Sequence, residues 1–337
     1  MATSTTHDHK VLVTGASGFV GSHVVNALLD DGIAVRVLLR SSERLDEFRA
    51  RGAEVIYGDL LDMEAVKLAV RGCHTVYHLA ARMLGSANSR GAYFPVNVEA
   101  SRQIARACAD LGVKRLVLAS SSGVHGIIHQ PPVNEQSAIN PSSAYRESKW
   151  LAEQAVRQQL GCSDCEWVIA RLSGLMGPGS LNWLGLCQAI DKGHFRIIGD
   201  GRNHDNVAYI GDIVQGLRLC AETAAAARQV YLLGGNPSID IRRIVKTIAA
   251  QLGVKASKRC LPVFPYRVYN SMAETYYRLS GHELPAVHRN ALFLADKVLD
   301  LSKAERELGY QPQVPFETGL KETIDWYLHE GLLRPRH

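Results

Sequence analysis

The sequence predicts an α/β fold in which a doubly wound parallel β-sheet is covered by helices on both faces. Over the first half of the chain, short apolar runs alternate with helical patterns, as expected for parallel strands joined by right-handed crossovers. A glycine-rich turn separates the first apolar run from the first helical pattern. The length of 337 residues exceeds what one simple domain needs, so we expect a larger α/β body and a smaller lobe.

Each predicted strand is a short apolar run, and the order of the runs fixes the order of the strands. The strands are predicted at Val11–Thr14, Ala34–Leu39, Glu54–Tyr57, Thr75–Leu79, Arg115–Ala119 and Trp167–Leu172. Ligands of such sheets bind beyond the carboxyl ends of the strands, so the site should lie there. The residues at or just after those ends include Gly15, Arg40, Asp59, Ala80 and Ser121.

The first strand is followed by the turn Gly15-Ala-Ser-Gly18-Phe-Val-Gly21 and then by a helical pattern. Gly15 permits a tight turn, Gly18 lets the backbone approach a pyrophosphate, and Gly21 lets the helix pack close to the sheet. The strand before the turn and the helix after it are the context that a nucleotide-binding turn requires. We therefore predict that this turn binds the phosphates of a nucleotide cofactor.

A second motif, Tyr145-Arg-Glu-Ser-Lys149, lies within a helical pattern over Ser143–Leu160. Residues four apart share a helical face, so the phenol and the ammonium should lie close together. A nearby positive charge lowers the pKa of a tyrosine, which is ordinarily near ~10. We predict that Lys149 holds the pKa of Tyr145 down and that Tyr145 acts as a general acid/base.

With both motifs present in this order, the chain resembles the extended short-chain dehydrogenase/reductases, and the resemblance runs essentially end to end. It implies a Rossmann-type NAD(P)-binding domain at residues 1–173, and mainly a substrate-binding lobe at 174–337, with some segments returning to the Rossmann body. The segment Leu301–Pro312 resembles the C-terminal signature of the family. We expect an NAD(P)-dependent dehydrogenase or reductase.

The resemblance implies roles for individual residues. Asn97 is expected to position a water behind Tyr145, and Asp59 to contact the adenine amine. Further cofactor contacts are expected from Gly15, Ser17, Gly18, Phe19, Val20, Gly21, Arg40, Leu60, Leu79, Ala80, Ala81, Tyr145, Lys149 and Leu172. Substrate contacts are expected from Met83, Ser121, His125 and Gly174.

The active-site hydroxyl comes from one of three consecutive serines, Ser120 to Ser122. The Ser/Thr-x-x-x-x-Gly spacing of the family, counted back from Gly126, selects Ser121, whereas a slip of one residue in the loop would select Ser122. In carbonyl reduction Tyr145 would donate the proton to the developing alkoxide, Ser121 would hold that oxygen, and Lys149 would contact the cofactor ribose.

The end of the second strand indicates which cofactor is preferred. An acid at this position favours NAD because it would repel a 2′-phosphate, but the chain has Arg40 followed by two serines. NADP(H) is therefore favoured, and NAD(H) stays open because Arg40 could instead stack on adenine or face solvent.

The substrate class is inferred from two departures from the nucleotide-sugar epimerases and dehydratases of the family. Those enzymes usually hold a diphosphate with an Arg where this chain has Asp205, and with an Arg-x-Gly-Asp that Val287–Phe293 lacks, although Arg289 could substitute. The pattern is more similar to the branch of 3β-hydroxysteroid dehydrogenases, dihydroflavonol reductases and 2-alkyl-3-oxoalkanoate reductases. We expect interconversion of a ketone and a secondary alcohol on an apolar substrate. A nucleotide-sugar epimerase/dehydratase with tightly bound NAD is the alternative, and a noncatalytic NADP-sensing module is a minor one.

The amino-acid composition indicates which binding partners and which cellular location to expect. The formal net charge of +5 is mild and no Lys/Arg run is present, so nucleic acid binding is not indicated. The chain has no apolar stretch of the roughly 18 residues that span a membrane, and its start lacks a signal peptide pattern, so we expect a cytoplasmic protein. The seven cysteines fit reduced thiols, and no metal site is expected from Cys162 and Cys165 or from His7 and His9.

The sequence also indicates an oligomeric state. The helical patterns Val96–Leu111 and Ser143–Leu160 correspond to the helices that often form a four-helix dimer contact in this family. We therefore expect a homodimer. The candidate apolar contributors are Tyr93, Val98, Ile104 and Trp150.

Overall fold

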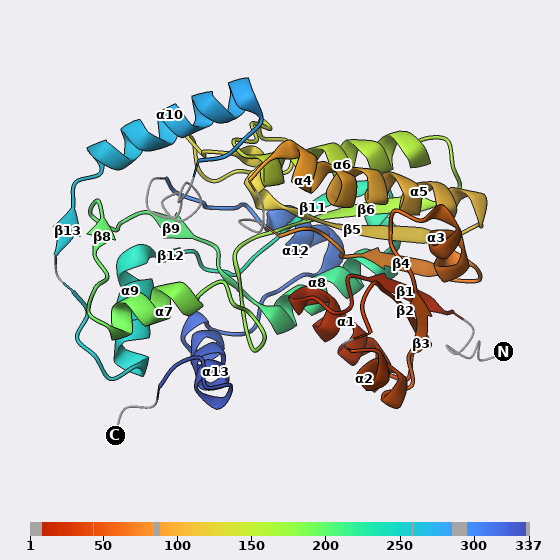
Figure 1. The fold of residues 1–337 in the computed structure, drawn as a ribbon, viewed down its shortest axis with the longest axis horizontal. Coiled ribbons are helices and arrows are strands. Elements are labelled where there is room, and N and C mark those ends of the chain that lie inside the picture. Colours follow the sequence, from red (N-terminus) through yellow and green to blue (C-terminus); the bar gives the residue numbers. More distant parts are fainter. Residues whose placement is uncertain (1–8, 43, 84–87, 258, 285–294, 335–337) are drawn as a thin grey trace.

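The computed structural model describes residues 9–42, 44–83, 88–257, 259–284 and 295–334. Its centre is a seven-stranded parallel sheet of order β11-β6-β5-β4-β1-β2-β3, with helices on both faces (Figure 1). This confirms the predicted α/β class. The strands are β1 Val11–Thr14, β2 Val35–Leu39, β3 Glu54–Tyr57, β4 Thr75–His78, β5 Arg115–Ser121, β6 Glu166–Leu172 and β11 Gln229–Leu233.

The helices form two layers because each buries one apolar face against the sheet. One layer contains α3 (Met63–Val70), α5 (Ala100–Asp110) and α6 (Ala144–Leu160), whose buried side chains form a core with the upper faces of β4, β5 and β6. The opposite layer contains α1 Phe19–Asp30, α2 Leu45–Ala50, α8 Ile210–Glu222 and α12 Ser302–Leu308.

A smaller lobe is built from the second half of the chain around its own apolar core. Its helices are α7 Leu184–Asp191, α9 Ile241–Gln251 and α13 Phe316–His329. Its strands are all two residues long: β7 Leu175–Met176, β8 Ile197–Ile198, β9 His204–Asp205, β10 Ala208–Tyr209, β12 Ile239–Asp240 and β13 Cys260–Leu261. Among the described residues, no helix is long and apolar enough to cross a membrane.

Three parts of the fold differ from the sequence expectations. Strand β11, from the second half of the chain, pairs with β6 and completes the sheet. The helix predicted at Val96–Leu111 begins earlier than expected, with α4 (Arg90–Phe94), and continues through a π-helical turn at Pro95–Glu99 into α5. The 17-residue helix α10 (Phe264–Ser280) lies in a stretch for which no element was predicted.

Candidate active site

The glycine turn after β1 is packed too closely to accept any side chain at two of its positions. Gly15 has a φ of +73°, and a Cβ there would lie 2.6 Å from the Ala80 backbone. A Cβ at Gly21 would lie 2.1 Å from the Gly15 carbonyl oxygen. The Gly18 amide donates to that same carbonyl at 3.0 Å, and α1 begins directly afterwards. This gives the backbone cradle at a helix start that a pyrophosphate requires.

Beside this cradle, the end of β4 holds a buried chain of hydrogen bonds. The Thr14 hydroxyl lies 2.7 Å from Nδ1 of His78, and Nε2 of His78 lies 3.0 Å from the Ser101 hydroxyl. Because Ser101 donates to the Asn97 carbonyl at 2.7 Å, the ring donates from Nε2 and accepts at Nδ1. Burial, with a smaller contribution from Lys149, lowers the pKa of His78 to about 3. The histidine is therefore neutral and fixes the strand ends.

Asn97 lies in the π-helical turn and is fully buried. Its amide group donates to the Arg82 carbonyl at 3.2 Å and to the Ser148 hydroxyl at 2.8 Å, and its oxygen accepts from the Arg82 amide at 2.7 Å. Both N–H groups are thus engaged. The side chain ties the loop after β4 to α6, and its role in positioning a water behind Tyr145 stays a prediction.

The predicted acid/base pair lies on the first two turns of α6. The Tyr145 phenol is partly buried, packs edge-on against Tyr93 at 5.9 Å between ring centroids, and lies near the Ser121 side chain. Burial raises the pKa of Tyr145 to about 12, while Ser121 and Arg146 act in the opposite direction. Our expectation that Lys149 holds this pKa down is not met, because burial and Tyr93 raise the pKa and the groups that lower it are Ser121 and Arg146.

Lys149 is only 4% exposed, and burial lowers its pKa to about 8 while the charge of Glu153 raises it. Glu153 has no exposed surface and forms a two-pronged ion pair with Arg171, at 3.0 and 2.8 Å. Lys149 therefore has a carboxylate one helical turn below it, and that carboxylate is held in place by an equally buried guanidinium.

The three serines at the end of β5 have different surroundings. Ser120 is buried and donates to Glu153 at 2.6 Å, so its hydroxyl belongs to the ion-pair cluster. Ser121 precedes a short 3₁₀ helix (Ser122–His125), accepts from the Gly123 amide at 3.1 Å, and lies beside the Tyr145 phenol. The register inferred from Gly126 therefore agrees with the contact between Ser121 and Tyr145.

The remaining predicted cofactor contacts follow the strand ends. Arg40 comes directly after β2 and is exposed. One oxygen of Asp59 accepts from the Leu61 amide at 2.9 Å. Ser17 provides a carbonyl that accepts from Arg44 at 3.2 Å, a contact that the sequence analysis missed. The side chains or backbones of Phe19, Val20, Leu60, Leu79, Ala80 and Ala81 are partly buried around the cradle, and Leu172 ends β6 in the core.

Of the predicted substrate contacts, His125 needs correction. It is 3% exposed, and its ring nitrogens face the Ala138 carbonyl at 3.1 Å and Arg171 at 3.3 Å. Both nitrogens are engaged in the interior, so we withdraw its assignment as a substrate contact. Met83 is 55% exposed and Gly174 is exposed.

The sequence analysis missed two cations near the site, Lys297 and Arg146. Lys297 lies 3.7 Å from Asp205, which is buried and faces Gly174. Burial raises the pKa of Asp205, whereas Lys297 lowers it. Arg146 packs beside Gly123 and donates to the Ser142 hydroxyl at 2.7 Å. The position of Arg146 directly after Tyr145 in the sequence motif could have indicated that it lies near the site. The Val287–Phe293 segment, including Arg289, and His7 lie outside the described residues.

Cys162 and Cys165 are free thiols. Within the part of the chain that the structure describes, no group of three His, Cys, Asp or Glu side chains could hold a metal ion.

Comparison with known proteins shows the family to which the chain belongs. Residues 11–234 match the NAD dependent epimerase/dehydratase family. The chain is 30% identical over 322 residues to a 4-hydroxy-2-methyl-3-oxo-4-farnesyl-3,4-dihydroquinoline-1-oxide ketoreductase of Stigmatella aurantiaca, covering 92% of this chain and 94% of the relative. It is 29% identical to the 2-alkyl-3-oxoalkanoate reductase of Stenotrophomonas maltophilia, covering 93% and 97%.

Among solved structures, MoeE5 in complex with UDP-glucose and NAD superposes with a TM-score of 0.74 at 25% identity, covering 95% of this chain and 99% of that one. Its fold agrees with the architecture described above. The chain therefore belongs to the NAD-dependent epimerase/dehydratase family, and it is an NAD(P)-dependent enzyme of the extended short-chain dehydrogenase/reductase type.

Proposed function

We propose that this enzyme interconverts a ketone and a secondary alcohol on an apolar substrate, with Tyr145 as the general acid/base. The observation that carries the proposal is the contact between the Tyr145 phenol and the Ser121 side chain at the carboxyl end of the sheet, with Lys149 one helical turn away. This is the geometry in which one hydroxyl can donate a proton to a carbonyl oxygen while a second hydroxyl holds that oxygen.

The residues around the glycine turn fit a nicotinamide dinucleotide, because the turn leaves no room for side chains where a pyrophosphate would contact the backbone. When bound, that cofactor supplies or accepts the hydride. Tyr145 moves the proton at the substrate oxygen, Ser121 orients that oxygen, and Lys149 would contact the ribose. Asn97 and His78 hold the surrounding loops in place through the hydrogen bonds described above.

The preference for NADP(H) remains a proposal, and it rests on Arg40. Its guanidinium is exposed at the end of β2, where no carboxylate competes for it among the residues the structure describes. Arg44, nearby in the chain, is already engaged by both oxygens of Glu47, at 2.7 and 2.6 Å. Arg40 is therefore the better-placed partner for a 2′-phosphate.

If Arg40 recognises the 2′-phosphate, NADPH should bind about tenfold to a hundredfold tighter than NADH, which corresponds to a charge-assisted bond of about 1.5–3 kcal/mol. Arg40→Ala should remove most of that gap without weakening NADH, and raising the salt concentration should narrow it in the wild type. Titration of cofactor fluorescence measures both affinities. Arg44→Ala is the matched control, and equal affinity of the wild type for the two cofactors would refute the role of Arg40.

An apolar substrate is supported by the residues beneath the site. Asp205 stands where an arginine would hold a diphosphate in nucleotide-sugar enzymes, and it is already paired with Lys297. The similarity to the Stigmatella ketoreductase and the Stenotrophomonas reductase supports the same chemistry here. A screen of apolar ketones with NADPH, followed by nicotinamide absorbance, tests the proposal directly.

The second candidate is a nucleotide-sugar epimerase or dehydratase that retains NAD. It is favoured by the cations Arg146 and Lys297 near the site and by the similarity to a structure that holds UDP-glucose and NAD. Conversion of a UDP-sugar without net consumption of cofactor, together with NAD that survives purification, would favour this candidate over ketone reduction.

We also propose a homodimer through the helices α4, α5 and α6. The candidate contacts need revision, because Tyr93 and Ile104 are completely buried within one chain and cannot reach a second copy. Val98 and Trp150 are partly exposed, although Trp150 is covered by Arg157 and Arg171. Light scattering at micromolar concentration should give twice the chain mass of 36.9 kDa. The mass of a single chain would exclude the dimer.

A further inference from the structure

Helix α10 carries its large apolar side chains on the outside of the protein. Phe264, Val268, Met272 and Tyr276 recur every four residues and are 72%, 42%, 64% and 44% exposed. Leu279 continues the same face and is 85% exposed. We call these five residues the α10 stripe. On the surface of a soluble protein, large exposed apolar side chains normally occur one at a time. A row of five along one helix therefore indicates a binding surface.

The inner face of α10 is short and specific. Ala273 and Tyr277 are its buried residues, and Tyr277 packs in a small cluster with Tyr93 and Ala144, against which Tyr145 also packs. The Tyr277 hydroxyl donates to Glu147, which also pairs with Arg90 at 2.8 Å. Helix α10 lies at the outside of the molecule (Figure 1). It is therefore anchored to the neighbourhood of Tyr145 by its buried residues and exposes the α10 stripe.

Basic residues outnumber acidic ones in the segment that contains α10. The described residues between 255 and 279 include four basic side chains, Lys255, Arg259, Arg267 and Arg278, and one acidic one, Glu274. Arg278 pairs with Glu274 at 2.7 Å. Lys255, Arg259 and Arg267 are exposed and have no carboxylate partner within the described part of the chain. On the helix, Arg267 and Arg278 lie to one side of the apolar arc.

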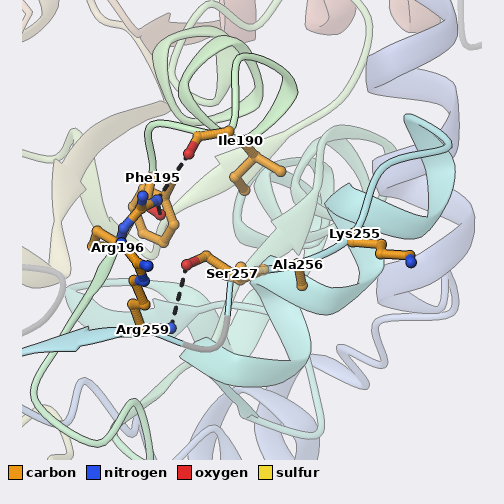
Figure 2. Close-up of a pocket in the computed structure, with 9 residues that line it drawn as sticks. Ile190, Phe195, Arg196, Lys255, Ala256, Ser257 and Arg259 are labelled. Atoms are coloured by element: carbon orange, nitrogen blue, oxygen red, sulfur yellow. Dashed lines mark hydrogen bonds between the residues drawn. The ribbon is translucent and has the colours of Figure 1, made fainter.

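A cavity lies next to the start of α10 and has the same sign of charge. It has a volume of about 400 Å³ and is lined by Arg196, Lys255, Arg259 and Ser257 together with apolar side chains of the lobe. Figure 2 shows Arg196 and Arg259 on the same side of this cavity, while Lys255 extends away from it. No acidic side chain is among its lining residues. Arg259 is five residues from Phe264, so the cavity and the stripe lie within ~18 Å of each other.

We propose that α10 docks this enzyme on a membrane surface that contains anionic lipids. The α10 stripe enters the boundary between headgroups and acyl chains, while Arg259, Arg267 and Lys255 meet the negatively charged headgroups. The positive charges favour an anionic membrane over a second copy of the chain, because two copies would bring the same positive residues to face one another. The 17-residue helix lies in the interface and does not cross the membrane. The proposal does not depend on which substrate the enzyme uses.

Sedimentation with vesicles tests the proposal. The wild-type protein should sediment with vesicles of phosphatidylcholine and phosphatidylglycerol in equal parts, far less with phosphatidylcholine alone, and less as the salt concentration rises. Leu279→Ser should weaken binding several-fold, and Phe264→Ser with Leu279→Ser at least about tenfold, because both side chains would leave the acyl boundary. Leu68→Ser is the matched control, since Leu68 is 51% exposed on α3.

Charge-reversal variants test the attraction to lipid headgroups separately from the insertion of apolar side chains. Arg259→Glu with Arg267→Glu should abolish the preference for the anionic vesicles, whereas Arg306→Glu on α12 should leave it unchanged. Thermal unfolding and cofactor binding confirm that each variant is folded. Wild-type protein that remains in the supernatant with both vesicles overturns the proposal. It is also overturned if Leu68→Ser acts as strongly as Leu279→Ser, or if the stripe variants change only the mass found by light scattering, which would make the stripe a contact between copies.

Discussion

Replacing Tyr145 by Phe is expected to lower turnover by about 10²–10⁴-fold while cofactor binding stays nearly intact. The reason is that the substitution removes only the hydroxyl, which lies beside Ser121 and is the group proposed to move the proton. The ring and its edge-on contact with Tyr93 remain. Single-turnover kinetics with NADPH and the best ketone from the screen would measure the loss in the chemical step itself.

The control for this prediction is Tyr277→Phe. Tyr277 packs in the cluster that Tyr145 also contacts, but its hydroxyl donates to Glu147. Its loss should change turnover far less than the loss of the Tyr145 hydroxyl. Lys149→Met is expected to impair both turnover and cofactor affinity, because Lys149 is proposed to touch the ribose as well. A Tyr145→Phe protein that kept more than a tenth of wild-type turnover would show that another group supplies the proton.

The second large effect is on stability. Glu153→Gln keeps the shape of the side chain but leaves Arg171, which is 2% exposed, without its counter-charge. Removal of one partner from a buried ion pair typically costs about 3–5 kcal/mol, because the remaining charge stays buried and unpaired. We expect a fall of this size in the free energy of unfolding, measured by urea denaturation at constant slope.

Arg157→Gln is the matched control for Glu153→Gln. Arg157 lies 3.6 Å from the same carboxylate, but its side chain is 30% exposed and so better screened by solvent. Its loss should cost clearly less than the loss of Glu153. Equal effects of the two substitutions would mean that the pair with Arg171 is not the source of the stability.

The sequence predicted the parts of the fold that are set by local pattern. The glycine spacing gave the turn after β1, and the apolar runs gave six strands to within a residue or two at their ends. It did not reveal β11, because a short apolar run far along the chain gives no information about the strand it will pair with. It also missed α10: apolar side chains recur every four residues along that helix, but Pro262, Pro265 and the paired tyrosines obscured the helical pattern.

The residues of the candidate site also divide into those that local motif spacing predicts and those that only the tertiary fold brings together. Tyr145, Lys149 and Ser121 follow from motif spacing, and the structure brings Tyr145 and Ser121 into contact. The family resemblance implied that His125 contacts the substrate, yet its ring faces Arg171 in the interior. Lys297 could not be predicted, because it is 92 residues from its partner Asp205 and only the tertiary fold brings them together.

Strand β11 has a consequence for how the protein can fold during synthesis. The sheet that holds the glycine turn is not complete until residues 229–233 have been made, and before that β6 has an open edge. A nascent chain that ends before this point exposes the backbone hydrogen-bonding groups of an otherwise buried strand, which is a template for aggregation. The cofactor-binding half therefore depends on the second half for its last strand, and the two halves should acquire stability together.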